Sequence, residues 1–322
     1  MFNHQIQATA LRNAITDSTK ILIISHKNPD GDTIGSAVAW LHYLTDLGKD
    51  VTAFCRDEVP NFLTFLPGIE RITNDQSIFD QNYDLIITND SASFDYAGID
   101  IFKDKINGTL LANIDHHASN ISYGDINIVI PTASSNTEVL TRLFRSWDVT
   151  ITKPMAYGLL TGIITDTDHM TNPGTNYQSL EIAAHLVTVG ADLHTIGQKT
   201  LRNRSMNTVK LWGLALSRLK HNTTYNIVTT YLTNDDLLEC DVNEQEAGGI
   251  SNYLSLIPNI NALIVLRFKG DGSIKGSMRT VKDSIPLHRL AVDYLGGGGH
   301  QKAAGFTMQG TLQVKGNSWT IV

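Results

Sequence analysis

Short apolar runs alternate with longer amphipathic segments through the first half of the chain. The runs are rich in isoleucine and leucine, which is typical of buried strands in a parallel sheet. They occupy residues 21–25, 51–55, 84–88, 109–114 and 126–130. Because strands that alternate with helices build doubly wound sheets, we expect an N-terminal α/β domain with a mainly parallel sheet.

The segments between these runs carry signals for helix boundaries. Gly48 follows one amphipathic run as a C-terminal cap, and Pro154 suits the first turn of another helix. Ser135 and Glu138 have the spacing of a capping box. These signals and the spacing of apolar residues predict helices over residues 5–19, 33–47, 135–147, 154–166 and 176–190.

The pattern changes after residue 190. Residues 191–220 remain helical but become basic, and we take them as a connector between two domains. Beyond it, apolar runs at 262–268 and 273–279 flank Lys269-Gly270-Asp271-Gly272, which is typical of a hairpin. Further elements are expected as a strand over 225–232 and helices over 245–256 and 286–294. We therefore predict a first domain over 1–190 and a smaller α/β domain with a mixed sheet over 221–322.

The composition narrows the class of protein. The chain has 322 residues and a net charge of -7, which disfavours a long nucleic acid held by bulk electrostatics but not a small phosphorylated ligand. Its two cysteines, Cys55 and Cys240, indicate a reducing compartment rather than a disulfide framework. No apolar run is long enough to cross a bilayer, and the first residues lack a signal-peptide pattern. We expect a cytoplasmic protein without a membrane partner.

Acidic residues and histidines follow three of these apolar runs and the apolar stretch 158–164 of a predicted helix. The four motifs are His26-Lys27-Asn28-Pro29-Asp30-Gly31-Asp32, Asn89-Asp90, Asp115-His116-His117 and Thr165-Asp166-Thr167. Open α/β sheets place their sites at the carboxyl ends of the strands, so these side chains are expected to meet there. Carboxylates and imidazoles that converge in this way are suited to a pair of divalent cations.

Each motif also has a simpler interpretation. The Asn-Pro-Asp-Gly sequence favours a polar turn by itself, and Asp90 alone is typical of an N-cap or a loop residue. The pair His116-His117 could be half-buried and satisfied locally. Asp166 at a helix C-terminus opposes the helix dipole, which a nearby cation explains better than capping does. The occurrence of all four motifs in one half of the chain favours a metal site.

These residues resemble the four motifs of the DHH phosphoesterase superfamily. The stretch Gly297-Gly298-Gly299-His300, followed by Ala303-Ala304-Gly305, resembles the signature of the DHHA1 substrate-binding domain of that superfamily. The resemblance covers nearly the whole chain. The two-domain layout is most similar to that of the Nrn-type nanoRNases, which are oligoribonucleases that also dephosphorylate 3′-phosphoadenosine 5′-phosphate (pAp).

The resemblance implies a role for each motif residue. One metal would be bound by His26 and Asp30, the second by Asp32, His116 and Asp166, and both by Asp90. Asp115 would orient a histidine, and His117 would contact the scissile phosphate. The substrate nucleotide would be held by Ser277, Arg279, Gly298, Gly299 and His300. The family commonly has an aromatic residue a few positions after the fourth-motif aspartate, whereas Asp168-His169-Met170 follows here.

The implied activity is that of a two-metal hydrolase. A metal-bridging hydroxide would attack phosphorus, and the metals would be manganese by preference, with magnesium, cobalt or iron as alternatives. The substrates would be short single-stranded RNA, from a dinucleotide to about a pentanucleotide, and pAp, which would yield AMP. The resemblance is also compatible with a homodimer.

Three other functions are considered. The first is a signalling phosphodiesterase that acts on a cyclic or linear dinucleotide, such as c-di-AMP or pApA. A family II inorganic pyrophosphatase shares the first-domain motifs, but the Gly297–His300 stretch argues against it. An inactive nucleotide-binding module would be expected to lack at least one metal ligand, whereas every position is filled here.

Overall fold

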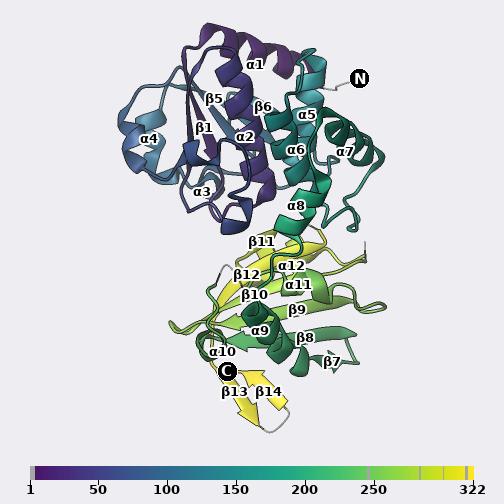
Figure 1. The fold of residues 1–322 in the computed structure, drawn as a ribbon. Coiled ribbons are helices and arrows are strands. Elements are labelled where there is room, and N and C mark those ends of the chain that lie inside the picture. The colour runs from purple at the N-terminus through teal and green to yellow at the C-terminus, as the bar shows by residue number, and fades with distance from the viewer. Residues whose placement is uncertain (1–3, 245–246, 283, 300, 316–317) are drawn as a thin grey trace. The chain divides into compact units, whose positions relative to one another are not determined.

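The computed structural model describes residues 4–244, 247–282, 284–299, 301–315 and 318–322. The chain divides into two units between Asn203 and Arg204, and each unit is built on its own sheet (Figure 1). The predicted connector comprises two helices, α8 (Leu193–Thr200) in the first unit and α9 (Met206–Ser217) in the second. No helix in the described ranges is long and apolar enough to cross a membrane.

The first sheet has six strands, all parallel, in the order β3-β2-β1-β4-β5-β6. Their bounds are β1 Lys20–Ser25, β2 Asp50–Cys55, β3 Ile72–Thr73, β4 Leu85–Asn89, β5 Leu110–Asp115 and β6 Ile126–Val129. The strand order reverses between β1 and β4, so the predicted doubly wound parallel sheet is confirmed. Strand β3 was not predicted, because two residues are too few to show a periodic pattern.

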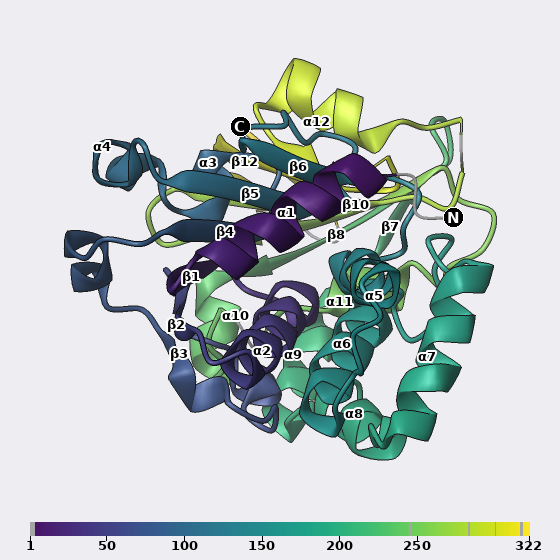
Figure 2. The same ribbon diagram turned by 90° about the horizontal axis from the view of Figure 1, so that it is seen from above.

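Helices cover both faces of this sheet (Figures 1 and 2). One face packs against long helices in the largest core cluster, and the other packs against short helical segments. The long helices are α1 Gln5–Asp17, α2 Gly31–Asp46, α5 Asn136–Ser146, α6 Lys153–Asp166 and α7 Tyr177–Val189. The short segments of the unit are η1 Asn61–Leu63, η2 Ile69–Arg71, η3 Gln76–Asp80, α3 Phe94–Ala97, η4 Asp100–Phe102 and α4 Lys103–Ile106.

The start of α2 lies against the end of α6. A Cβ built on Gly31 would lie 2.3 Å from Thr165 Oγ1, so only glycine fits at this position without a shift. Asp30 caps α2 by accepting hydrogen bonds from the backbone N–H groups of Asp32 and Thr33. This contact places the first-motif aspartates next to the fourth-motif residue, Asp166.

The second sheet is mixed, as predicted, with the strand order β11-β12-β10-β9-β8-β7. Only β8 and β9 pair in parallel. The strands are β7 Lys220–Asn222, β8 Ile227–Thr233, β9 Ala262–Phe268, β10 Ser273–Arg279, β11 Gly298–Gly299 and β12 Ala303–Gln309. A separate hairpin comprises β13 Leu312–Lys315 and β14 Ser318–Ile321. The hairpin predicted from residues 262–279 is present as β9 and β10.

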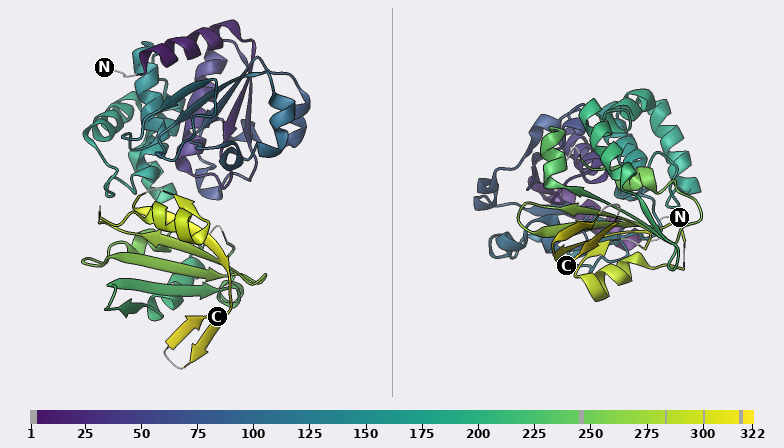
Figure 3. Two further views of the ribbon diagram at one scale, coloured as in Figure 1. Left: turned by 180° about the vertical axis from the view of Figure 1, so that it is seen from behind. Right: turned by 90° about the horizontal axis from the view of Figure 1, so that it is seen from below.

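Helices also cover both faces of the second sheet. The helix α12 (Leu287–Leu295) packs on one face (Figure 3), and α9 and α11 (Ile250–Leu254) pack on the other. The short helix α10 (Asn234–Glu239) follows β8. The helix predicted over 245–256 is shorter than expected, because Gly249 has a left-handed conformation with φ of +89° that precedes the first turn of α11. Residues 245 and 246 lie outside the described ranges.

Candidate metal centre

Three of the four motifs follow neighbouring strands of the first sheet. The strands β1, β4 and β5 end level with one another, because Asn89 pairs with Ser25 on one side and with Ile114 on the other. The motif residues that follow these pairs are His26, Asp90 and Asp115. Asp90 has a left-handed conformation with φ of +54° and donates its backbone N–H to the carbonyl of Ile114. The sheet therefore brings these motifs to one edge, as the sequence predicted.

The first group of facing side chains comprises His26, Asp30 and Asp90. His26 Nε2 lies 3.2 Å from Asp90 Oδ2 and 3.7 Å from Asp30 Oδ1. The other ring nitrogen, Nδ1, lies 2.9 Å from the carbonyl oxygen of Lys27, which can only accept. Nδ1 therefore carries a proton. Burial alone would lower the pKa of His26, but Tyr96 and Asp30 raise it well above its usual value, so Nε2 would offer its lone pair to this group once a cation displaced its proton.

The second group comprises Asp32, His116 and Asp166. His116 Nε2 lies 3.5 Å from Asp166 Oδ2 and 3.9 Å from Asp32 Oδ2. It also lies 3.5 Å from Asp90 Oδ1. Asp90 thus stands between the two groups, with Oδ2 toward His26 and Oδ1 toward His116.

The charges of these groups are strongly coupled. Burial, together with the neighbouring carboxylate of Asp90, raises the pKa of Asp32 to about 7, although His116 opposes the change. Burial also raises the pKa of Asp166 well above its usual value. Burial alone would lower the pKa of His116, but the facing carboxylates raise it well above the usual value. Without a cation, the acids and imidazoles share protons, and a divalent ion would replace those protons.

The donor atoms fit a divalent cation. The ligand atoms in each group lie within 4.8 Å of one another, and all are carboxylate oxygens or imidazole nitrogens. Asp90 Oδ1 is buried and lacks a well-aligned hydrogen bond among the described residues, although His116 Nε2 at 3.5 Å and His117 Nδ1 at 3.4 Å face it. A buried carboxylate oxygen is costly unless a cation or a proton donor faces it. The absence of thiolates suits manganese, magnesium or iron.

Asp32 is held by the N-terminus of α5. Its Oδ1 accepts hydrogen bonds from Thr137 N at 2.9 Å and Thr137 Oγ1 at 2.7 Å, and its Oδ2 accepts one from Asn136 N. The predicted capping box at this terminus is only half present. Ser135 Oγ accepts from Glu138 N, but the Glu138 carboxylate accepts from Ser134 N instead of Ser135 N. Because the Ser135 side chain accepts only from Glu138 N, the N–H groups of Asn136 and Thr137 are left for Asp32.

Asp115 orients the third histidine. Its Oδ1 accepts hydrogen bonds from the backbone of His116 at 2.7 Å and of His117 at 3.1 Å, and from His117 Nδ1 at 2.7 Å. Because Nδ1 donates to Asp115, the lone pair of neutral His117 lies on Nε2. The His117 side chain is 15% exposed, compared with 6% for His116 and 2% for His26. Of the three rings, His117 is therefore the best placed to meet a ligand from solvent.

Two neighbouring residues were missed by the sequence analysis. Asn120 Nδ2 lies 2.5 Å from Asp115 Oδ2 and donates to it, and the Tyr96 ring packs 4.7 Å from the His26 ring. Asn120 follows the third motif closely, but asparagine is common in turns, so its residue type carries no specific signal. Tyr96 lies in a short helix beyond the second motif, and nothing in its local pattern marks it.

The segment after the fourth motif forms an unusual turn. Asp168, His169 and Met170 all have positive φ values, of 49°, 58° and 63°. Met170 N donates to Thr167 Oγ1, and the Met170 side chain packs against the main core cluster. Where the family commonly has an aromatic residue, this chain therefore has a left-handed turn that is anchored by a core methionine.

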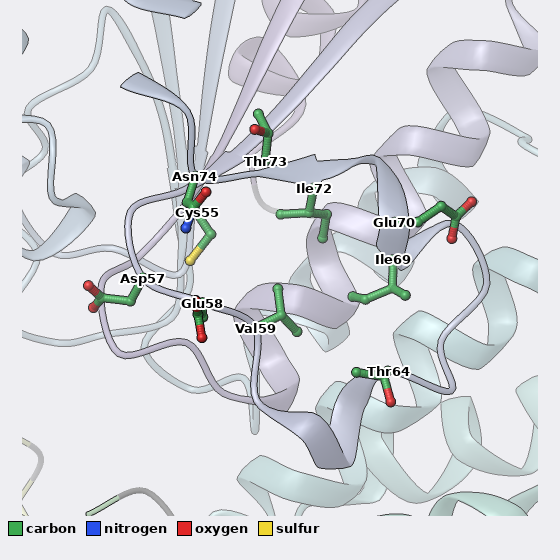
Figure 4. A pocket seen from close by; sticks show the side chains of 10 residues that line it. All are labelled: Cys55, Asp57, Glu58, Val59, Thr64, Ile69, Glu70, Ile72, Thr73 and Asn74. Atoms are coloured by element: carbon green, nitrogen blue, oxygen red, sulfur yellow. The ribbon is translucent and has the colours of Figure 1, made fainter. Parts of the chain in front are cut away.

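A pocket of about 410 Å³ lies beside the first motif (Figure 4). Two of its lining residues contact that motif: Asp57 Oδ2 accepts from Asn28 N at 2.6 Å, and Cys55 Sγ donates to the carbonyl of His26. Asp57, Glu58 and Glu70 give the lining a negative charge, which opposes an anionic ligand. The pocket supports the motif but is unsuited to a phosphorylated substrate.

The remaining predicted residues lie in the second unit. Ser277 of β10 and Gly298 of β11 both pair with Gly305 of β12, so β12 joins the two segments. Arg279 Nε donates to Asn252 Oδ1 at 3.0 Å. The glycine run is closely packed rather than a loose linker, because a Cβ on Gly297 would lie 2.0 Å from the carbonyl oxygen of Gly305. His300 lies outside the described residues.

Comparisons with known proteins agree with the motifs. Residues 20–163 match the model of the DHH family, N-terminal domain, and residues 224–316 match that of the DHHA1 domain. A bifunctional oligoribonuclease and PAP phosphatase, NrnA, of Thermus thermophilus is 29% identical over 292 residues, which cover 90% of this chain and 84% of that protein.

Two further relatives are informative. A probable manganese-dependent inorganic pyrophosphatase of Streptococcus agalactiae is 27% identical over 192 residues, which cover 57% of this chain and 60% of that protein. The crystal structure of an exopolyphosphatase-related protein from Bacteroides fragilis is similar, with a TM-score of 0.87 and 29% identity. That similarity covers 95% of this chain and 92% of the other.

Proposed function

Because this chain belongs to the DHH family, carries a DHHA1 domain and is thus a phosphoesterase, we propose that it hydrolyses short oligoribonucleotides and pAp with two divalent metal ions. The products are mononucleotides from the RNA and AMP from pAp. The enzyme is then both an oligoribonuclease and a 3′(2′),5′-bisphosphate nucleotidase.

The observation that carries this proposal is the position of Asp90 between two groups of ligands. Its Oδ2 lies 3.2 Å from His26 Nε2, and its Oδ1 lies 3.5 Å from His116 Nε2. His26 and Asp30 would hold one ion, and Asp32, His116 and Asp166 the other, with Asp90 shared. When bound, the ions would activate a water molecule as the nucleophile and neutralise charge on the phosphoryl oxygens.

Manganese is the proposed metal. The ligands are oxygen and imidazole nitrogen only, which suits manganese, while magnesium, cobalt and iron remain chemically acceptable. The pyrophosphatase relative, which matches over 57% of this chain, is named as manganese-dependent. Preference among these metals depends on coordination geometry more than on ligand type.

The chain's own side chains position the substrate. Asp115 fixes the tautomer of His117, so that Nε2 of His117 can contact a non-bridging oxygen of the scissile phosphate. Ser277 and Arg279 in the second unit supply a hydroxyl and a guanidinium for a distal phosphate. The backbone N–H groups of Gly298 and Gly299 would add to this site, since glycine allows close approach of an anion to the backbone.

The substrate class is supported by the relatives and by charge. The Thermus relative, which covers most of this chain, is named for action on oligoribonucleotides and PAP. The net charge of -7 opposes a long polyanion more than a short one. We therefore propose short single-stranded RNA, and a cyclic or linear dinucleotide is the alternative within the same chemistry.

A product time course tests the proposal. The purified protein with manganese would receive an RNA dinucleotide, a pentanucleotide, pAp and cyclic di-AMP in parallel. Release of mononucleotides from both RNAs and of phosphate from pAp is the expected result. Faster opening of cyclic di-AMP with little pAp turnover would replace the proposal with a signalling phosphodiesterase. Binding of these ligands without hydrolysis would indicate an inactive nucleotide-binding module.

A further inference from the structure

Strand β10 carries three polar side chains on one face of the second sheet: Lys275, Ser277 and Arg279. The intervening residues Ile274 and Met278 are buried in the core cluster beneath α12. Because side chains alternate along a strand, the three polar residues project from the opposite face, about 7 Å apart in succession. This spacing is comparable with that of successive phosphates in an extended single strand.

The neighbouring strand leaves this row accessible. Lys275 is exposed, and Ser277 and Arg279 are partly exposed. On β12 the row pairs with three smaller residues, Thr307, Gly305 and Ala303. On the other side, β9 places Val265 and Leu263 beside Ser277 and Arg279, and both are buried in the core cluster under α9 and α11. A ligand could therefore reach the row from the side of β12, without displacing a bulky side chain of that strand.

Positive charge gathers at the Lys275 end of the row. Lys275 pairs directly with Arg267 on β9, which places two cations opposite each other. Glu244 is engaged elsewhere: its carboxylate lies 3.2 Å from Lys269 Nζ, and its carbonyl accepts a hydrogen bond from Arg267 at 2.8 Å. Partial burial of the Lys275 side chain, with Arg267 and Lys269 nearby, lowers its pKa, although Glu244 opposes the change. Like charges directly opposite on a sheet are destabilising, so an anion would relieve this arrangement.

We propose that Lys275, together with Arg267, forms an additional phosphate-binding position on β10. This position accepts an internucleotide phosphate of RNA beyond the nucleotide that is held at Ser277 and Arg279. This inference rests on the proposed function. pAp has only two phosphates, and the proposed function already assigns both of them to other groups. An oligoribonucleotide has further phosphates, and the position therefore favours longer fragments over pAp.

A purely solvated surface explains the row less well. Lys269 in the same hairpin has an acidic partner, Glu244, whereas Lys275 forms no hydrogen bond or ion pair within the described part of the chain. Three cations, Arg267, Lys269 and Lys275, lie around this hairpin, and its acidic neighbours Asp271 and Glu244 lie toward Lys269. A repulsive pair that is kept at an accessible position is typical of a binding site rather than of a stabilising contact.

The test compares Lys275→Ala with Lys210→Ala, which removes the same charge from the exposed side of α9 in the same unit. For the pentanucleotide, Lys275→Ala should lower kcat/KM about ten-fold, as expected for loss of a charged hydrogen bond. For pAp, kcat/KM should change little. The slope of log kcat/KM against log salt for the pentanucleotide should fall by about 0.7, the value for one phosphate of a single strand. Lys275→Arg should restore both quantities.

Each contrary result has a distinct meaning. If Lys275→Ala lowers kcat/KM equally for pAp and the pentanucleotide, Lys275 does not form a separate phosphate-binding position. If Lys210→Ala lowers kcat/KM for the pentanucleotide as much as Lys275→Ala does, the effect of Lys275 is one of overall charge alone. If the wild-type protein hydrolyses neither substrate, the proposed function fails on its own. The inference is then decided by fluorescence anisotropy of the labelled pentanucleotide, with Lys275→Ala expected to bind about ten-fold more weakly. Unchanged affinity in that variant would overturn it.

Discussion

Gly35 in α2 and Gly158 in α6 bring two helix backbones into direct contact. A Cβ on Gly35 would lie 2.3 Å from the carbonyl oxygen of Gly158, and a Cβ on Gly158 would lie 2.5 Å from that of Gly35. These helices carry Asp32 at the start of one and Asp166 at the end of the other. The separation that the two glycines allow therefore sets the distance between proposed ligands of one metal ion.

Gly35→Ala should separate α2 from α6. The added methyl group meets backbone atoms that cannot rotate away, so the free energy of unfolding is expected to fall by about 1–3 kcal/mol. Manganese affinity should also fall, because Asp32 and Asp166 would move apart. Chemical denaturation and the shift of Tm with added manganese measure the two effects.

Gly197→Ala in α8 is the matched control. No atom lies within 4 Å of a Cβ built there, so this change should stabilise the helix by about 0.5–1 kcal/mol. If Gly35→Ala is as harmless as Gly197→Ala, the close contact between α2 and α6 does not control the site.

Asp90→Asn tests the shared ligand. Removing a residue that only supports a ligand typically costs 10–100-fold in metal affinity or activity, so loss of a ligand to both ions should cost more than about a hundred-fold in kcat. The metal-free variant should lose stability at neutral pH. Burial alone would raise the pKa of Asp90, but His116, His26 and His117 hold it below its usual value, so the charged form stabilises the folded state. Saturating manganese should raise the Tm of the wild-type protein but not of the variant.

The control for this experiment is Asp95→Asn. This substitution removes the same charge at a nearby residue, but the Asp95 side chain is exposed and its carboxylate lies 2.9 Å from Lys27 Nζ. The Asp95→Asn variant should keep both the hydrolytic activity and the manganese-dependent shift of Tm. Full activity of Asp90→Asn, with an unaltered response to manganese, would remove Asp90 from the metal centre.

The first sheet could be predicted from the sequence because its strands are long, apolar and separated by helices. The placement of His26, Asp90 and Asp115 followed from the same pattern, since each comes directly after a strand and parallel strands end at one edge. The pattern also grouped Asp166 with these motifs, but its sharing of one metal ion with Asp32 was predicted only through family resemblance. It depends on glycine contacts between α2 and α6, which leave no periodic signal.

The second unit was less predictable because its elements are short. The strand β11 has two residues and α11 has five, so neither shows a period. The positive φ of Gly249, which limits α11, is a local property that glycine permits but does not require. Asn120 could not be singled out either, because its contact with Asp115 depends on the folded loop rather than on residue type.

A further prediction concerns the ion pair between Arg218 and Asp236 in the second unit. Burial would raise the pKa of Asp236, but hydrogen bonds from Arg218 and Thr233 outweigh it and hold the pKa below its usual value. The resulting stability is fully present above the unfolded pKa, about 3.9, and is lost as pH falls through the lower folded pKa.

Asp236→Asn should therefore reduce stability at neutral pH by about 2 kcal/mol, and the difference from wild type should shrink as pH falls below about 4. Calorimetry between neutral and acidic pH would measure it. Asp235→Asn, an exposed neighbour on the same turn, should show no such pH dependence. A constant difference for Asp236→Asn at all pH values would contradict the assignment.

Asn120→Ala should affect the chemical step more than substrate binding. Asn120 Nδ2 donates to Asp115 Oδ2, and Asp115 Oδ1 in turn fixes His117. Loss of this donor frees a buried carboxylate to rotate, so we expect kcat to fall about 10–100-fold, as for other residues that support active-site ligands. KM and manganese content should stay close to wild type.

Asn113→Ala separates this role from a merely structural one. Asn113 is buried and hydrogen-bonds Thr88, Ser91 and Asn120, but no hydrogen bond joins it to Asp115 among the described contacts. Its loss should destabilise the unit by about 1–3 kcal/mol, as much as that of Asn120, because buried polar groups lose partners in both cases. If orientation of Asp115 matters, only Asn120→Ala lowers kcat strongly at a temperature where both variants are fully folded. Equal losses of kcat in proportion to stability would instead make Asn120 a structural residue of the loop, and Asp115 would hold His117 without its help.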